Sequence, residues 1–154
     1  MFSALNFLYS GGEMGRLIRD HDWSGNPVGT PDAWPQPLRF ALNICMGSSF
    51  PTAIYWGPEL RLFYNDAWAH IPAERHPWAL GQRGADVFPE IWNVVGPQFD
   101  RVMQTGEGFA AFDQRLDMFR DGRTQETYWN YSFTPIRDEH GAVVGILNQG
   151  NETT

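Results

Sequence analysis

The chain has 154 residues, enough for one domain with a substantial core, because domains of this length bury roughly 70% of the surface that their unfolded chains expose. Apolar residues make up 42% and aromatic residues 15% of it, which is too much large apolar surface for a disordered segment. The net charge is −7, and the 11 basic residues are all Arg and form no cluster larger than a pair. Nucleic-acid binding, which needs a basic stripe to displace counterions, is therefore disfavoured.

The opening stretch MFSALNFLYS lacks the basic start and the long apolar middle of a signal peptide, and no apolar run is long enough to span a membrane. We therefore expect a cytoplasmic chain without membrane insertion in this segment. The single cysteine, Cys45, excludes an internal disulfide and a cysteine-based zinc cluster. We interpret it as a core residue.

The N-terminal third has a helical pattern. Thr30 suits an N-cap and Pro31 the first helical position, and Pro35 and Pro37 restart a helix. An apolar stripe follows at helical spacing, which we interpret as core packing: Leu38, Leu42, Cys45 and Met46.

In the middle of the chain the helical pattern gives way to a strand pattern. The segment PTAIYWGPELRLFYN holds two runs rich in β-branched and aromatic residues, separated by a Gly-Pro pair, and predicts a hairpin. Asn65 then lies where it could cap a helix. Four prolines between residues 72 and 97 allow only short helical pieces, and Pro97 fits the start of a longer helix that ends at Gly106.

The C-terminal part predicts three strands. The first is expected to bury the apolar residues that alternate with charged ones, Phe112, Leu116 and Met118. The second places Thr127, Trp129, Tyr131 and Phe133 on one face, because successive side chains point to opposite sides. The turn RDEHG, which precedes the third strand, is typical of a solvated hairpin rather than of a catalytic cluster. Together these elements indicate an α+β fold with helices on one face of an antiparallel sheet.

These segments carry a family resemblance. YWNYSFTPIRDEHGAVVGILNQGNETT resembles the last two strands of a PAS domain, with Thr134 and Pro135 ending a strand and Glu152 in an exit signal that usually has Asp. LRLFYNDAW resembles the second PAS strand and the helix start that follows it, supplied here by Asn65 and Ala67. The resemblance covers roughly residues 50–154 and implies a PAS domain with a five-stranded antiparallel sheet. Residues 1–49 resemble the helical extension or cap that precedes this PAS type at the N-terminus of bacterial sensor histidine kinases.

The PAS resemblance implies a cup with a cavity between sheet and helices. Six residues are the candidates for lining it and for binding a ligand: Ile54, Trp56, Trp129, Tyr131, Phe133 and Asn148. A buried Asn148 needs hydrogen-bond partners, which a small polar ligand or a water could supply. The alternative is that the aromatic residues simply fill the core.

The residue types at the expected ligand positions limit which cofactors the domain could bind. The stretch LGQRGADVFPEI has no Cys, which disfavours the covalent flavin of light-sensing PAS domains, and GPQFDRVMQTGE has no His, which disfavours haem. His70 and His76 are weak alternatives as haem ligands, and non-covalent flavin stays open. No His pair has metal-ligand spacing, so we expect no metal. A small metabolite or no ligand is the expectation.

The predicted function is a cytoplasmic sensory input domain of a bacterial signal-transduction protein, which binds a small molecule or partner and relays the change to a C-terminal effector, such as a histidine kinase. The alternative is a ligand-free dimerisation or protein-interaction module in which residues 2–9, rich in apolar side chains, pair two chains. A small-molecule enzyme is a third, weaker alternative, because the predicted cavity offers no acid or base and the chain has no nucleophile elbow. We expect no catalytic residue.

Overall fold

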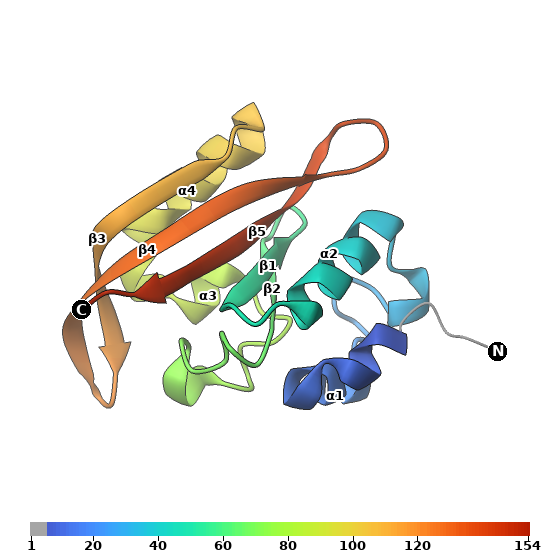
Figure 1. Ribbon diagram of the computed structural model, residues 1–154, viewed down its shortest axis with the longest axis horizontal. Coiled ribbons are helices and arrows are strands. Elements are labelled where there is room, and N and C mark those ends of the chain that lie inside the picture. The colour runs from blue at the N-terminus through green and yellow to red at the C-terminus, as the bar shows by residue number, and fades with distance from the viewer. Residues whose placement is uncertain (1–5) are drawn as a thin grey trace.

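An antiparallel sheet in the order β2-β1-β5-β4-β3 forms the centre of the molecule (Figure 1). The computed structural model describes residues 6–154, and their side chains from residue 8 onward. The five strands are β1 (Thr52–Trp56), β2 (Arg61–Tyr64), β3 (Phe109–Arg120), β4 (Arg123–Arg137) and β5 (Val143–Glu152). The first and last strands pair with each other, so the C-terminal strand lies in the middle of the sheet.

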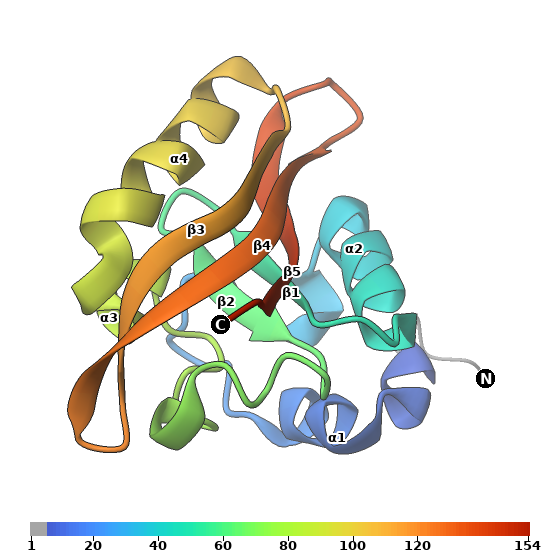
Figure 2. The ribbon, with the colours of Figure 1, turned by 60° about the vertical axis from the view of Figure 1, so that its left-hand side comes forward.

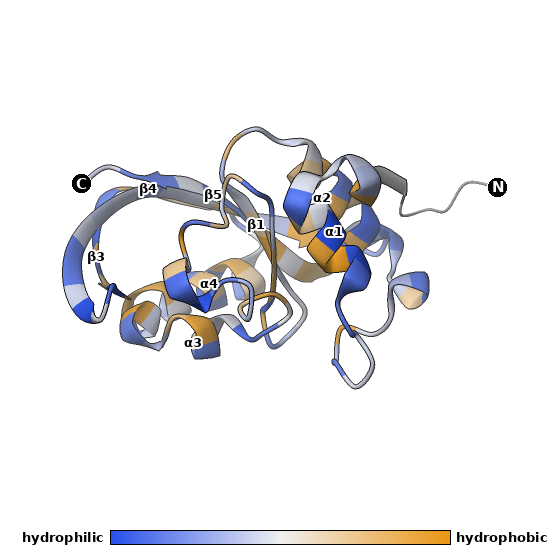
Figure 3. Cartoon of the chain, turned by 90° about the horizontal axis from the view of Figure 1, so that it is seen from below, coloured by the Kyte–Doolittle hydropathy of each residue, from blue (hydrophilic) through white to orange (hydrophobic). Residues whose placement is uncertain are grey.

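Short helices cover the concave face of this sheet (Figures 2 and 3). They are η3 (Ala73–Arg75), α3 (Gly84–Val87), η4 (Pro89–Ile91) and α4 (Trp92–Thr105). Phe99 of α4 stacks on Phe133 of β4 with ring centroids 4.1 Å apart, which fixes the helix on the sheet. Gly106 ends α4 in a left-handed conformation, as predicted. The prediction that Pro97 starts this helix is wrong, since Pro97 lies in its second turn.

The N-terminal extension packs against the opposite face of the sheet, beside β1 and β2 (Figure 3). It comprises η1 (Asn6–Ser10), α1 (Gly12–Asp20), η2 (Pro31–Ala33) and α2 (Gln36–Gly47). Trp23 stacks on Phe63 of β2 at 5.2 Å, and Trp34 meets the same ring edge-on at 5.4 Å. The predicted apolar stripe of α2 is buried. Both faces of β1 and β2 are therefore covered.

Two neighbouring side chains tie the extension to the end of β2. The carboxylate of Asp66 accepts hydrogen bonds from the backbone N–H groups of Glu13 (3.1 Å) and Met14 (2.7 Å) and so caps α1 from a distant part of the chain. Asn65 is 3% exposed, and its amide donates to the carbonyl of Cys45 at the end of α2 (3.0 Å). Asn65 also accepts from the N–H of Trp68 (3.1 Å), as a cap would, but residues 66–72 form turns and not the helix that the sequence predicts there.

Strand β3 departs from simple alternation. Its pairing with β4 shifts between Ala111 and Gln114, and Asp113 there has a φ of 48°, so one extra residue is inserted as a β-bulge. Phe112 is consequently 78% exposed, and the prediction that it faces the core is wrong. Beyond the bulge, Leu116 and Met118 are buried as expected.

The two ends of the chain meet the predictions to different extents. The predicted pairing segment, residues 2–9, lies largely outside the described side chains; within it, Leu8 is buried and Tyr9 is exposed. The RDEHG turn is exposed, and the Asp138 carboxylate accepts from the backbone N–H groups of His140 and Ala142. Within residues 6–154, no helix is both long and apolar enough to cross a bilayer.

Candidate functional site

A cavity lies between the concave face of the sheet and the helices that cover it. Its volume is about 60 Å³, and its lining is almost wholly apolar and aromatic. Strands β1, β4 and β5 supply one wall, while Phe88, Ile91 and Phe99 supply the other. No charged side chain of the described residues belongs to the lining.

Four of the six predicted cavity residues meet at this lining: Trp129, Tyr131, Phe133 and Asn148. The strict alternation of β4 brings the three aromatic residues to one face, and Asn148 lies opposite Phe133 in the β4–β5 pairing. All four are at least nine-tenths buried. The structure thus assembles the predicted aromatic wall, and its role in binding stays a prediction.

The structure does not bring Ile54 and Trp56 to the cavity, so their predicted placement is corrected. Ile54 pairs with Phe63 of β2, whose ring contacts Trp23 and Trp34 of the extension, and it therefore lies on the opposite face. Trp56 follows on the same face as Ile54, because side chains alternate along β1. Tyr55, between them, lines the cavity instead.

Trp68 is a second cavity residue that the sequence analysis missed. It lies in the irregular segment after β2, where no regular period indicates the direction of a side chain. Its indole N–H donates to Oδ1 of Asn148 at 3.1 Å. The Asn148 amide in turn donates to the carbonyl of Ser132 at 3.3 Å. Protein groups therefore meet the hydrogen-bonding need that had pointed to a ligand or water at this asparagine.

Two further polar groups of the lining are also engaged by protein. The indole N–H of Trp129 donates to the hydroxyl of Thr127 (2.7 Å), and the Tyr131 hydroxyl donates to Oε1 of Gln98 on α4 (2.6 Å). Burial raises the pKa of Tyr131 to about 12, although the Gln98 bond opposes that shift. Tyr131 is therefore neutral at physiological pH.

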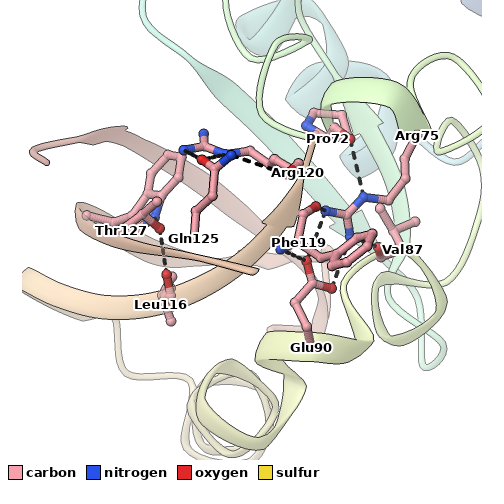
Figure 4. A network of polar contacts seen from close by, with 10 residues as sticks. Pro72, Arg75, Val87, Glu90, Leu116, Phe119, Arg120, Gln125 and Thr127 are labelled. Atoms are coloured by element: carbon pink, nitrogen blue, oxygen red, sulfur yellow. Dashed lines mark hydrogen bonds and ion pairs between the residues drawn. The ribbon is translucent and has the colours of Figure 1, made fainter. Parts of the chain in front are cut away.

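A partly buried ion pair fastens the helical wall of the cavity to the sheet (Figure 4). Arg75 of η3 donates to the carbonyls of Val87 and Phe119, both at 2.6 Å, and pairs with Glu90 of η4 at 2.9 Å. Glu90 also accepts from the backbone N–H of Phe119 in β3 at 2.9 Å. Because Phe88 and Ile91 flank Glu90 in sequence and line the cavity, this ion pair links the cavity wall to the β3–β4 hairpin.

A second ion pair joins the same hairpin to the end of β5. Arg120 donates to both carboxylate oxygens of Glu152, at 2.9 and 3.3 Å, and also to Oε1 of Gln125. The Arg120 hydrogen bond holds the pKa of Glu152 below its ordinary value of 4.5. Glu152, the residue that stands where the PAS exit signal usually has Asp, is therefore anchored to the hairpin beside the cavity.

Cys45 and the two histidines named above as weak haem ligands, His70 and His76, are not part of the cavity lining. Cys45 is buried in α2 on the opposite face of the sheet, and burial raises the pKa of its thiol to about 12. His76 shares a 2.7 Å hydrogen bond with the Tyr64 hydroxyl, and His70 is exposed. Among residues 6–154, no three His, Cys, Asp or Glu side chains gather where they could hold a metal ion.

No protein-family model and no curated protein matches the sequence. Solved structures do match the fold: a LOV protein of Rhodobacter sphaeroides (TM-score 0.58, 12% identity, 77% of this chain and 67% of that one) and a PAS domain from Colwellia psychrerythraea (0.56, 12%, 76% and 97%). A sensory box sensor histidine kinase of Vibrio cholerae is similar at a TM-score of 0.53 and 12% identity, over 75% of this chain and 90% of that one.

This chain has the PAS fold. Its five-stranded antiparallel sheet with several short helices matches those neighbours, so the predicted fold class and the PAS resemblance are confirmed. At 12% identity the likeness extends to the fold alone. The names of the three neighbours are a sensor histidine kinase, a PAS domain and a LOV protein.

Proposed function

We propose that this PAS domain is the sensory input module of a bacterial signal-transduction protein. It binds a small molecule in the cavity and relays the change through β5 to an effector, such as a histidine kinase, that follows in the full-length protein. The observation that carries this proposal is the aromatic cavity, closed on one side by short helices rather than filled by side chains. The segment works in the cytoplasm and has no catalytic role of its own.

The cavity size favours a small ligand over a large cofactor. Sites that hold drug-sized molecules usually measure about 300–1,000 Å³. The cavity here, at about 60 Å³, is far below that range. A flavin or haem would have to displace much of the wall, so a small metabolite is the better fit.

The two ion pairs supply a route for the relay. A ligand changes output only by binding one conformation more tightly than another, typically with about 1–3 kcal/mol of difference. Outward movement of η4 would shift Glu90, and with it Phe119, to which it is hydrogen-bonded. Arg120 follows Phe119 in the chain and is hydrogen-bonded to Glu152, so the movement of Phe119 would also displace the end of β5.

Substitution of Trp129 tests the cavity. Trp129→Ala removes part of the aromatic wall, whereas Tyr128→Ala, its matched control, alters a side chain on the other face of β4. We expect native mass spectrometry of freshly purified protein to show a bound small molecule in the wild type and in Tyr128→Ala and to show its loss in Trp129→Ala. Equal occupancy in the two variants would contradict the cavity as the binding site. An absorbance spectrum of the same sample reveals any flavin or haem.

A second candidate function, association of two chains, is favoured by a separate observation. Two large apolar residues one turn apart on α2, Phe40 and Ile44, are 63% and 62% exposed. Phe50 and Phe112 are exposed to a similar extent and border a shallow hollow on the outer face of the sheet. Apolar surface of this kind commonly marks a protein contact.

The homodimer has its own test. In this proposal Phe40→Glu combined with Ile44→Glu places charges in the contact and converts a dimer to a monomer in size-exclusion chromatography with light scattering. Trp78→Glu changes another exposed aromatic residue away from α2 and leaves the dimer intact. A wild-type monomer, or a dimer that survives the double substitution, contradicts the proposed contact.

A further inference from the structure

Tyr55 differs from the other polar residues of the cavity lining. Its side chain is 4% exposed, and within the described residues its hydroxyl has no hydrogen-bond partner. The ring packs on Phe99 with centroids 4.5 Å apart. It also fits closely against Gly84, where a Cβ atom would lie only 2.9 Å from the Tyr55 ring. The Tyr55 ring is thus fixed by apolar contacts, while its hydroxyl makes no hydrogen bond to another described residue.

Within the described residues, Arg39 Nε is the one fully enclosed side-chain polar atom without a partner, so the Tyr55 oxygen, which has no protein partner, can still be reached by a water or by a polar group of a ligand. The other polar groups of the lining already have partners: Asn148, Trp68, Trp129 and Tyr131. Burial raises the pKa of Tyr55, so its hydroxyl keeps its proton at physiological pH and can donate or accept. The free hydrogen-bonding capacity of the cavity therefore resides at Tyr55.

We propose that the cavity binds a neutral, mostly apolar molecule of about one ring, whose single polar group hydrogen-bonds the Tyr55 hydroxyl. The inference rests on the proposed ligand-sensing function and adds the chemistry of the ligand. Charge is excluded because the lining has no counter-ion, and an unpaired charge inside an apolar cavity costs far more than a neutral polar group. Aromatic walls on both sides favour a flat apolar body.

The cavity volume sets how the ligand enters. At about 60 Å³ the cavity has room for roughly four waters, taking about 15 Å³ for each. An aromatic ring needs more, since an engineered cavity that binds benzene measures about 150 Å³. The ligand must therefore push the wall outward, and the wall residues on short elements are Ile91, which ends the three-residue η4, and Phe88, which precedes it.

Matched probes test this chemistry. The full chain is titrated with phenol, with toluene, and with the charged compounds benzoate and benzylamine, while the indole N–H signals of Trp68 and Trp129 are followed by NMR. Phenol is expected to shift these signals saturably and to bind roughly three- to tenfold more tightly than toluene, the gain typical of one hydrogen bond. Neither charged compound is expected to bind.

The variant Tyr55→Phe removes only the hydroxyl. It is expected to lower phenol affinity to that of toluene and to leave toluene affinity unchanged, whereas Tyr131→Phe, which removes a hydroxyl already bonded to Gln98, preserves the preference for phenol. If phenol and toluene bind equally and Tyr55→Phe changes neither, the Tyr55 inference is overturned and the ligand-sensing function stands. If no neutral probe shifts either indole signal, the ligand-sensing function itself fails. Stronger binding of a charged probe overturns the ligand class.

Discussion

Asn65 shows how much one buried amide can organise. Its NH₂ group lies within 2.9–3.2 Å of the carbonyls of Cys45, Ser48 and Phe50, and its oxygen accepts from the N–H groups of Thr52 and Trp68. These contacts join the end of α2, the start of β1 and the segment after β2. An amide is the side chain that can donate and accept at once, which this position requires.

Replacement of Asn65 is therefore expected to be costly. Asn65→Ala leaves several buried backbone groups without partners, and each such group costs about 1–3 kcal/mol. We expect a loss of about 2–4 kcal/mol in the free energy of unfolding, measured by urea denaturation. Asn43→Ala, at an exposed position of α2, is the control and should change stability little. A comparable loss in both variants would show that the hydrogen bonds of Asn65 are not the cause.

At the same scale, the sequence predicts some cavity residues and misses others for one physical reason. In β4, the buried Thr127, Trp129, Tyr131 and Phe133 alternate with less buried residues, so periodicity shows which side chains point inward. In β1 both faces are covered, and residues 52–55 are all buried, so alternation does not tell the cavity face from the face under the extension. For that reason the sequence analysis places Ile54 at the cavity, where the structure has Tyr55.

At the scale of elements, the β3–β4 hairpin bridges the helical wall and the end of β5. Arg75 and Glu90 hold it at Phe119, and Arg120 binds Glu152 from the adjacent position. The sequence shows these residues as ordinary surface charges, because their pairing depends on contacts between segments 15 and 32 residues apart. Likewise, the start of α4 at Trp92 was missed because Pro97 is tolerated inside that helix.

The Arg120–Glu152 pair predicts a specific dependence on pH. Because Arg120 lowers the folded-state pKa of Glu152 below 4.5, the pair stabilises the fold above about pH 4.5, and this contribution is lost as the pH falls through the folded-state pKa. In Arg120→Gln the pKa of Glu152 should rise toward 4.5. An NMR titration of the Glu152 carboxyl carbon measures this shift.

The control for this titration is Arg115→Gln, which removes an exposed arginine that pairs with Asp117 and Glu126 on the same hairpin. It should leave the pKa of Glu152 unchanged. If Arg120→Gln leaves it unchanged as well, Arg120 is not what anchors the end of β5.

At the scale of the whole molecule, the sheet is enclosed on two sides. The α3–α4 side borders the cavity, and the extension covers Phe63 and Ile54 on the other side. The core is continuous across this arrangement, since Trp23 and Trp34 belong to the same buried cluster as Phe99. The resemblance that divides the chain into residues 1–49 and 50–154 thus separates parts that share one core.

A deletion tests whether residues 50–154 can stand alone. Without residues 1–49 the side chains of Phe63 and Ile54 lose their cover, and Asn65 loses the carbonyls of Cys45 and Ser48 as hydrogen-bond partners. We expect the shortened chain to lose its cooperative thermal transition in circular dichroism or to aggregate. Deletion of residues 1–5 alone is the matched control. An unchanged melting temperature for residues 50–154 would show that the extension is a separate unit.

The segment from Asn65 to Trp68 acts on both sides of the sheet at once. Asp66 grips the first turn of α1, while Trp68, two residues later, holds Asn148 inside the cavity. A ligand that displaced the indole of Trp68 would therefore also shift α1, on the other side of the sheet, through the backbone of residues 66–68. The N-terminal extension would then move together with the end of β5 when a ligand binds. A spin label on α1 would detect that movement.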